Sequence, residues 1–396
     1  MPERLTIENL GPIAEFTVEP RPLTVLIGEQ ATGKSLVAQV LYFFRSFKQH
    51  LSELYRPDIA ESEGWQEKIL GKMLDRLRGV PFSAFAERNT FLQFNTEFVD
   101  WKIGFQEKTV KFEAGPSLRD AMADWVFEWE KNKHSLGDPG GVLQVFIPTE
   151  RSVFTQLWNR AQSVLFAEDQ PWPVRKFAER LTVAHSIYQA LYHRFPVDLV
   201  DVNVSVGERL QDFQKNALAG EAYVPEIGPQ IWKWKVSSEG ENIIPIEAIA
   251  SGQMEAWPFF VIGAAFGVGK EPVDFYFEEP ETHLHPRAQV EIMKAIVFLV
   301  NHGHRFVITT HSPFLLYVLN NMIQRFLTYG ENPPEGTIAL DPEKVAAYRM
   351  GSDPGTIMDR EDTGLIDLND LEKVADELGG EFDRLLEAAE SGAESE

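Results

Sequence analysis

The chain has 396 residues, and its 60 acidic side chains outnumber 37 Lys and Arg, which gives a net charge of −23. A protein that grips a long track of phosphates is usually basic, so this charge disfavours extensive nucleic-acid binding, although a local basic patch is still possible. The chain contains no cysteine, which excludes disulfides, thiolate catalysis and zinc–thiolate sites.

The sequence predicts a soluble, cytoplasmic protein. Residues 1–5 run directly into strand-like sequence and show no signal-peptide pattern. The longest uncharged apolar run, about residues 257–269, is too short to span a bilayer. We therefore expect no membrane partner. The length allows one large domain or two ordinary ones with an ample core.

The N-terminal segment leads to a phosphate-binding loop. Residues 5–10 and 13–18 predict two strands joined at a Gly-Pro turn, and residues 23–27 predict a third, buried strand. Residues 28–35 then fit the pattern G-x-x-x-x-G-K-[ST], and residues 35–44 carry apolar side chains at helical spacing. Such a strand-to-helix turn aims backbone N–H groups and a helix N-terminus at one anion.

Each position of this loop has an expected role. Lys34 would reach the β- and γ-phosphates, and the Ser35 hydroxyl would hold Mg²⁺. A chance match in a glycine turn is the alternative, and the strand and helix on either side argue against it. We therefore predict that the chain binds a nucleoside triphosphate. The loop residues that would surround the phosphates are Gly28, Glu29, Gln30, Ala31, Thr32, Gly33, Lys34 and Ser35.

The middle of the chain predicts a mixture of helices and short strands. No internal repeat and no long heptad run occurs, so a coiled-coil arm is not expected. The expected elements are helical sequence over 49–90 with a break near 78–81, a hairpin or small meander over 96–112, a helix over 117–133, a buried strand over 142–148, helices over about 153–163, 174–194 and 207–219, and strands over 231–236 and 243–246.

From residue 249 onward helices and strands alternate, which indicates a parallel α/β sheet. The phosphate-loop strand would join this sheet after a long insertion. The expected elements are helices over 254–266, 287–301 and 314–326, strands over 273–277 and 305–310, an edge strand over 344–350 and an amphipathic acidic helix over 369–390.

Two acids follow the apolar strand that ends near residue 277. Beside a phosphate loop, one such acid belongs to the Mg²⁺ shell and the next orients water for attack on the γ-phosphate. The first acid is Glu278, where Asp is commoner, so its longer side chain would contact Mg²⁺ through water. Glu279 is our candidate for the catalytic base. The alternative is a solvated acidic loop.

The order of two further segments in the chain indicates that they belong to the same site. His311 ends the next predicted strand, from which it could reach the γ-phosphate or the attacking water, although a lone histidine is often structural. Ser251, Gly252 and Gln253 precede an apolar helix, where Ser251 suits an N-cap and Gly252 allows close backbone approach. Alone this segment would be only a capped helix. Its position between the phosphate loop and the two acids favours a functional role.

These motifs together resemble a known group of proteins. The phosphate loop, the Ser-Gly-Gln helix start, Glu-Glu-Pro-Glu-Thr-His-Leu-His-Pro at 278–286 and Thr-His-Ser-Pro at 310–313 are similar to the ABC-type ATPases of the SMC, RecF and OLD group. In particular, they resemble the compact ATPases that accompany effectors in bacterial antiphage systems such as Septu and PARIS. The runs 7–13 and 147–152 are also similar to that group. The resemblance covers about residues 1–48, 142–152 and 243–370.

The resemblance implies a P-loop NTPase fold of the ABC/SMC head type, an α/β fold with a mixed sheet, flanking helices and an inserted, mainly helical lobe. The ATPase core would comprise residues 1–48 and 243–396, and the latter segment would end in the acidic helix. Residues 49–141 would form an inserted helical and hairpin region. Residues 142–242 would contribute a core strand followed by a helical lobe.

The resemblance also implies an ATP sandwich with ATP and Mg²⁺ as cofactors. Two copies would pair head to tail as a homodimer or a higher homo-oligomer. Lys34 and Ser35 would then act on the nucleotide in cis, and Ser251 of the second copy would reach the γ-phosphate in trans. A separately encoded effector, a nuclease or toxin, would be the partner.

The sequence departs from the transporter pattern. It lacks Leu-Ser-Gly-Gly-Gln, which disfavours a transporter ATPase, and it lacks a guanine-specific Asn-Lys-x-Asp motif, which favours adenine. A transporter-type glutamine is not identifiable, and Glu150 and Arg151 are both candidates for its place.

Two other sites are suggested by the sequence but disfavoured. His283 and His285 could form a metal pair, but a turn near the dimer contact explains them better. A cluster of acids near the C-terminus raises the question of a fused Toprim nuclease, for which the stretch after His311 is too short. We expect a solvated acidic tail instead. The acids concerned are Asp359, Glu361, Asp362, Asp367 and Asp370.

The leading hypothesis is therefore an ATPase whose ATP-driven dimerisation controls a partner effector in antiphage defence. A DNA-repair or DNA-tethering ATPase of RecF or SMC type is an alternative, and it predicts salt-sensitive duplex binding. The acidic composition and the missing coiled coil count against it. A third hypothesis is a scaffold that binds ATP with little turnover, and Glu278 in place of Asp keeps it open.

Overall fold

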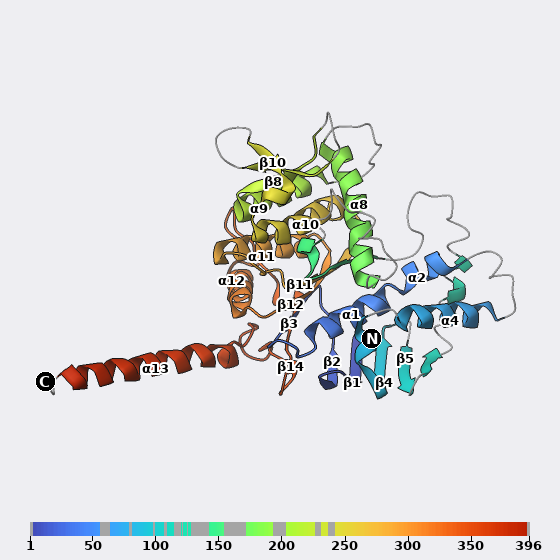
Figure 1. Cartoon of the computed structure of the whole chain (residues 1–396), viewed down its shortest axis with the longest axis horizontal. Helices are drawn as coiled ribbons and strands as arrows, with labels where there is room; N and C mark the ends of the chain where they lie inside the picture. The colour runs from blue at the N-terminus through green and yellow to red at the C-terminus, as the bar shows by residue number, and fades with distance from the viewer. Residues whose placement is uncertain are drawn as a thin grey trace.

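The computed structural model describes residues 3–55, 64–78, 81–97, 100–106, 109–114, 120, 122–124, 126–127, 142–153, 172–192, 203–225, 231–236 and 242–393. A central mixed sheet has helices on both faces, and an antiparallel sheet lies beyond the helices of one face (Figure 1). This is the α/β architecture with flanking helices that the sequence predicts. In the described part of the chain, every helix is too short or too polar to cross a membrane.

The central sheet is six-stranded and parallel except at one edge. In spatial order its strands are β14 (Gly355–Thr356), β13 (Val345–Arg349), β3 (Leu23–Ile27), β12 (Arg305–Thr310), β11 (Val273–Glu278) and β7 (Leu143–Ile147). The strand before the phosphate loop, β3, is therefore internal. The edge strand expected at 344–350 forms as β13, but the short antiparallel β14 lies outside it.

Both faces of the inner strands are buried, which explains why these strands are mostly apolar rather than alternating. Every residue of β3 and of β11 is buried. Successive side chains face two different cores, so that Val25 packs under the helices of one face and Leu26 under those of the other. Burial of each such side chain contributes about 1.5–3 kcal/mol. This apolar pattern holds β3 inside the sheet.

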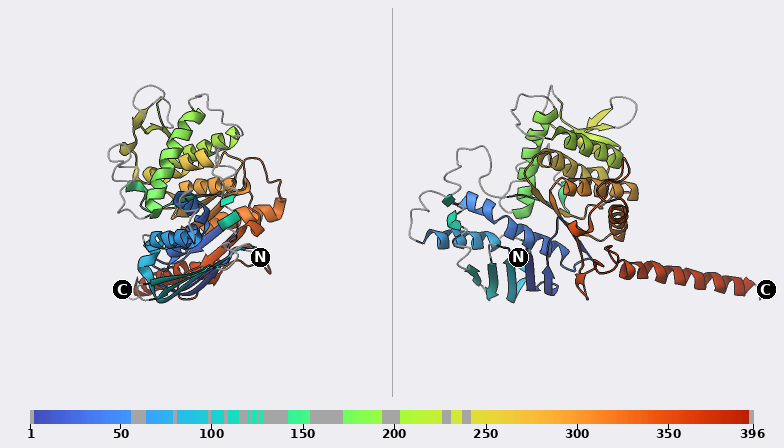
Figure 2. Two further views of the ribbon diagram at one scale, coloured as in Figure 1. Left: turned by 90° about the vertical axis from the view of Figure 1, so that its right-hand side faces the viewer. Right: turned by 180° about the vertical axis from the view of Figure 1, so that it is seen from behind.

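One face of the sheet carries the helical lobe and the C-terminal helices of the core (Figure 2). Trp232 and Trp257 are fully buried there, with ring centroids 5.1 Å apart. The helices are α8 (Trp172–Tyr192), α9 (Val204–Leu218), α10 (Ser251–Phe266), α11 (Pro286–Asn301) and α12 (Pro313–Tyr329), with the short η2 (Ile246–Ala248) and η3 (Pro342–Lys344).

A small antiparallel sheet completes the lobe. Its order is β10 (Ile243–Pro245), β9 (Lys233–Val236) and β8 (Gly220–Tyr223). β8 was not predicted from the sequence. Its four residues carry too little periodicity to be recognised, and pairing with β9 is what makes them a strand.

The other face carries the helix that follows the phosphate loop and a five-stranded antiparallel sheet. The helices are α1 (Lys34–Arg45), α2 (Phe47–Leu54), α4 (Trp65–Arg78) and the short η1 (Pro81–Phe85). In spatial order the strands are β2 (Ile13–Val18), β1 (Arg4–Leu10), β4 (Ala86–Asn95), β5 (Asp100–Gln106) and β6 (Thr109–Ala114).

This sheet corrects two expectations. Residues 86–90 are strand rather than helix, because β4 pairs with β1 and buries Leu92 and Phe94 on one face. The hairpin or small meander expected over 96–112 is confirmed, because β5 pairs antiparallel with both β4 and β6. Because β4 to β6 extend the sheet that β1 and β2 begin, the division expected at residue 48 runs through one sheet.

Two expected helices, over 117–133 and about 153–163, lie mostly outside the described residues. The acidic helix expected over 369–390 forms as α13 (Asn369–Ala393). It extends away from the rest of the molecule in both Figure 1 and Figure 2. Residues 376–388 are exposed along its length.

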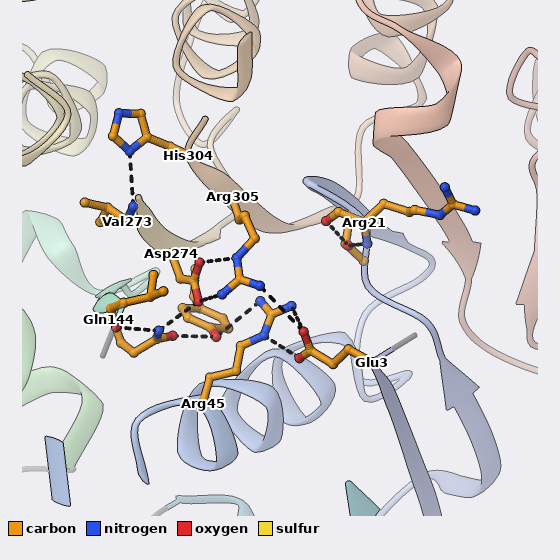
Figure 3. Close-up of polar contacts among 11 residues, drawn as sticks. Glu3, Arg21, Arg45, Gln144, Val273, Asp274, His304 and Arg305 are labelled. Carbon is orange, nitrogen blue, oxygen red and sulfur yellow. Dashed lines mark hydrogen bonds and ion pairs between the residues drawn. The ribbon is translucent and has the colours of Figure 1, made fainter. Parts of the chain in front are cut away.

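A polar network joins the layers at the first residues of β11 (Figure 3). The Asp274 carboxylate is buried and accepts hydrogen bonds from Arg305 Nη2 at 2.6 Å and from Gln144 Nε2 at 2.8 Å. On α1, Arg45 donates to Glu3 at 2.6 and 2.9 Å. This network lies at the opposite end of the strands from the phosphate loop, so it stabilises the layers without entering that edge.

We predict that Asp274→Ala lowers the free energy of unfolding by about 2–4 kcal/mol, because Arg305 and Gln144 lose a buried acceptor. The exposed acid Glu271 provides a control, since Glu271→Ala should change stability by less than about 0.5 kcal/mol. Urea unfolding measures both variants. Equal midpoints for Asp274→Ala and the wild type would contradict the role given to the network.

Candidate active site

Three adjacent parallel strands bring the predicted site residues to one edge of the central sheet. Glu278 of β11 pairs with Thr309 of β12, and Thr310 of β12 pairs with Ile27 of β3. The segments that follow these strands therefore begin side by side. In open α/β sheets, ligands bind at this carboxyl edge of the strands.

The phosphate loop has the backbone that its glycines predict. Gly33, the N-cap of α1, has a φ of +96°, and a Cβ at this position would lie 2.6 Å from Ile13 Cγ1. Residue 33 must therefore be glycine for both its conformation and its space. α1 begins immediately afterwards at Lys34, so the positive end of the helix dipole lies at the loop.

The Lys34 ammonium lies inside the loop. Lys34 is buried, and its Nζ donates to the carbonyl oxygens of Gly28 at 2.9 Å and Glu29 at 2.7 Å. Its Nζ also lies 3.3 Å from Nδ1 of His311. Burial lowers the pKa of Lys34. The negative charges of Glu279 and Glu281 raise this pKa by a smaller amount. A triphosphate would replace loop carbonyls as the partner of this buried charge.

Glu278 has the environment of a metal-site carboxylate. It is buried, its Oε2 accepts from the Thr149 backbone at 3.3 Å, and its Oε1 has no hydrogen-bond partner among the described residues. Burial raises its pKa to about 7, and the adjacent Ser35 hydroxyl lowers it by a smaller amount. An unpartnered buried oxygen beside a hydroxyl fits the oxygen ligands that Mg²⁺ prefers.

The metal site predicted here does not need a cluster of protein ligands. In the described segments, no group of three or more His, Asp and Glu side chains is arranged to hold a metal ion. Mg²⁺ commonly takes one or two protein ligands and completes its shell with phosphate oxygens and water. Ser35 and Glu278 fit that pattern.

Glu279 lies where the chain turns sharply after β11. Its φ is +44°, a left-handed conformation that costs a non-glycine residue about 1 kcal/mol or more. Its backbone N–H donates to the Thr309 carbonyl at 2.9 Å, and its Oε1 lies 3.2 Å from Nε2 of His311. His311 therefore bridges Lys34 and Glu279, and the three side chains form one continuous polar line.

Glu281 is a site residue that the sequence did not single out. Its Oε1 accepts from Thr310 Oγ1 at 2.6 Å and from the His311 backbone N–H at 2.8 Å. It thereby fixes the segment that carries His311. The signal was present as the third acid of Glu-Glu-Pro-Glu, but its role depends on a contact between β12 and the turn after β11.

The two candidates for the transporter-type glutamine have different positions. Glu150 is exposed and close enough to contribute to the raised pKa of Glu278. Arg151 is fully buried, and its guanidinium donates to backbone carbonyls, including that of Glu278 at 2.8 Å. Glu150 is thus the residue of the pair that faces the open edge.

The Ser251 segment begins α10, with one correction. Ala250 is the N-cap and Ser251 is the first helical residue, because Gln253 accepts the Ala250 N–H at 2.9 Å and caps the helix itself. Ser251 is exposed. A Cβ at Gly252 would lie 2.4 Å from the His283 carbonyl oxygen, so the helix start packs against the turn after β11.

The residues of the two disfavoured sites make local contacts. His283 lies 3.7 Å from Glu255, whereas His285 accepts the Arg287 N–H at 3.3 Å as the N-cap of α11, so the two rings have separate partners. The Asp359 carboxylate accepts the Thr363 hydroxyl at 2.8 Å, a local turn contact.

A family model described as an AAA ATPase domain matches residues 159–316, less than half of the chain. The matched segment contains Ser251, Glu278, Glu279 and His311 and begins after the phosphate loop. No curated protein matches the chain. The family match and the site together support an ATP-binding ATPase.

Solved SMC head domains are similar to this chain. The SMC head bound to the C-winged helix domain of ScpA is 11% identical, with 89% of this chain and 96% of that chain covered and a TM-score of 0.46. The SMC head domain from Thermotoga maritima is 11% identical, with 88% of this chain and 95% of that chain covered and a TM-score of 0.38. An SMC head domain with an extended coiled coil, bound to the C-terminal domain of ScpA derived from Pyrococcus furiosus, is 10% identical. The match covers 96% of this chain and 100% of that chain, with a TM-score of 0.43.

Glu278→Gln tests the burial of the metal-site carboxylate. The folded protein holds a proton on Glu278 up to a pKa of about 7, whereas the unfolded chain loses it near 4.5. As pH rises from 4.5 through 7, the wild type should therefore lose up to about 3 kcal/mol of stability relative to Glu278→Gln.

Urea unfolding of both proteins without metal at pH 5, 6, 7 and 8 measures this difference, and Glu271→Gln is the exposed control. Stability curves for the wild type and Glu278→Gln that run parallel across this range would contradict the burial argument.

Proposed function

We propose that the protein is a cytoplasmic ATPase that hydrolyses ATP in a head-to-tail dimer and uses the dimer to control a partner. The observation that carries the proposal is the polar line from Lys34 through His311 to Glu279. It connects the residue expected at the phosphates to the residue expected to activate water. A site that only binds the nucleotide would not need the contact between His311 and Glu279.

In the proposed reaction, water attacks the γ-phosphorus while the bond from that phosphorus to the β–γ bridging oxygen breaks. Glu279 accepts a proton from the attacking water, and the products are ADP and inorganic phosphate. Lys34 and the N–H groups of the loop stabilise the charge that develops on the phosphate oxygens. His311 lies within 3.2 Å of the Glu279 carboxylate and orients it.

Ser35 and Glu278 would hold Mg²⁺ in this site. The ion would supply charge neutralisation between the β- and γ-phosphates. Glu278 must be ionised to serve it, and because burial raises its pKa to about 7, the site should bind the metal more tightly at pH 8 than at pH 6.

The dimer is proposed from Ser251. Its hydroxyl is exposed at the start of α10, and the contacts of the neighbouring Gln253 and Gly252 go to Leu218 and His283 rather than to residues 28–35. An exposed hydroxyl and a helix N-terminus suit the γ-phosphate of a second subunit. The partner's Ser251 would then complete the site.

The partner under control would be a separately encoded effector, a nuclease or toxin in antiphage defence. This part of the proposal rests on the resemblance of the motifs. A low-turnover scaffold is the second candidate. It is favoured by the Lys34 ammonium, which its own loop carbonyls already satisfy, and by the use of Glu278 in place of Asp.

We predict that Lys34→Ala abolishes ATP binding and that Glu279→Gln retains binding but lowers kcat by at least about a hundredfold, because the water loses its base. Phosphate release by the purified proteins measures the turnover, and light scattering with and without ATP measures the mass. Glu279→Gln should form an ATP-dependent dimer.

Glu271→Gln is the control, because it removes an exposed acid that precedes β11, at the opposite end of that strand from Glu279. Wild-type turnover in Glu279→Gln would show that another group is the base. A mass that never responds to ATP would favour the scaffold.

A further inference from the structure

The end of β7 leaves the turn after β11 without a strand partner on one side, whereas β12 still pairs with it on the other. β7 and β11 pair as far as Ile147 and Phe277, and β7 then stops at Pro148. The carbonyl groups of Glu278 and Glu279 therefore lose the neighbour that would continue the ladder. Buried backbone carbonyls need donors from elsewhere.

The Arg151 guanidinium donates to both carbonyls, and the Thr282 N–H and hydroxyl also donate to the Glu279 carbonyl, at 3.2 and 2.9 Å. Arg151 is fully buried, and its Nη1 donates to the Glu278 carbonyl at 2.8 Å while its Nη2 donates to the Glu279 carbonyl at 2.8 Å. Nη1 also donates to the Pro148 carbonyl at 2.9 Å. The guanidinium thus clamps the turn that holds Glu279 in its left-handed conformation.

The same guanidinium reaches the helix that begins at Ser251. Arg151 Nε donates to the Glu255 backbone carbonyl at 2.7 Å and lies 3.5 Å from the Glu255 carboxylate. Glu255 is one helical turn beyond Ser251. Since Gly252 packs against His283 in the turn after β11, the helix start and the acid turn are joined at two points.

We propose that Arg151 is a positioning residue that sets the backbone of Glu279 and ties it to the start of α10. Through this contact, a displacement of α10 when Ser251 engages a second subunit alters the aim of the Glu279 carboxylate. The proposal deepens the proposed function and rests on it, and it assigns Arg151 no contact with the nucleotide.

Arg151→Lys is the test, because a lysine keeps the charge but cannot span four carbonyls in a planar fork. The expected result is a fall in kcat of about tenfold to a hundredfold. The KM for ATP should change by less than about threefold, because the phosphate loop is untouched. Backbone amides of residues 279–284 should exchange hydrogen faster than in the wild type.

Arg45→Lys is the matched control (Figure 3). The Arg45 side chain is also largely buried, and it pairs with Glu3 at the opposite end of the strands. Its replacement should destabilise the fold and leave kcat per folded molecule and the exchange of residues 279–284 unchanged. Equal effects of the two replacements on kcat, or an unchanged kcat in Arg151→Lys, would overturn the proposal.

If Arg151→Lys does not fold, Glu255→Gln decides the question, because it removes only the carboxylate on α10 and keeps the carbonyl contacts. A lower kcat with an unchanged KM would support the tie, and an unchanged kcat would overturn it. Absence of any Lys34-dependent hydrolysis in the wild type would instead contradict the proposed function, and the exchange of residues 279–284 in Arg151→Lys would still test the clamp.

Discussion

The parallel pairing of β12 with both β3 and β11 is the constraint on which the site depends. Because β12 lies between them, the chain segments after Ile27, Glu278 and Thr310 emerge side by side at one edge. Each segment supplies one chemical part: a phosphate loop, a pair of acids and a histidine. A slip of one residue between these strands would turn Glu278 from its buried position beside Ser35 and separate His311 from Lys34.

The charges at this edge are unbalanced in a way that suits a Mg²⁺-bound triphosphate. Glu255, Glu278, Glu279 and Glu281 all lie close enough to Arg151 to act on its ionisation. Lys34 adds a second buried cation. Glu278 and Glu281 each have a buried oxygen without a hydrogen-bond partner in the described residues. Buried acids of this kind are costly unless a cation pairs with them, and Mg²⁺ would supply that charge at Glu278.

Sequence reasoning succeeded where a local pattern determines the structure. The phosphate loop, the buried strand before it and the helix after it depend on glycines and apolar spacing within some twenty residues, and all three form within a residue or so of their expected bounds. The acids and His311 could be placed together because parallel strands end at the same edge. Their roles in hydrolysis are still predictions.

Sequence reasoning failed where a role depends on a distant contact. The sequence predicts a helix over residues 86–90, but they belong to β4, which pairs with β1, some 80 residues earlier in the chain. The contacts of Arg151 and Glu281 could not be predicted from the residues around them, because each side chain bonds to backbone groups at the end of another strand. The sequence suggests Ser251 as an N-cap, but Ala250 occupies that position and the Gln253 side chain accepts the Ala250 N–H.

The most direct test of this account is a crystal structure of the protein with a non-hydrolysable ATP analogue and Mn²⁺, whose anomalous signal locates the metal. The account predicts the triphosphate on residues 28–35, with Lys34 at the γ-phosphate and the metal between Ser35 and Glu278. It also predicts the partner's Ser251 at the same γ-phosphate. A metal bound away from Glu278, or a nucleotide bound away from the loop, would contradict the central claim.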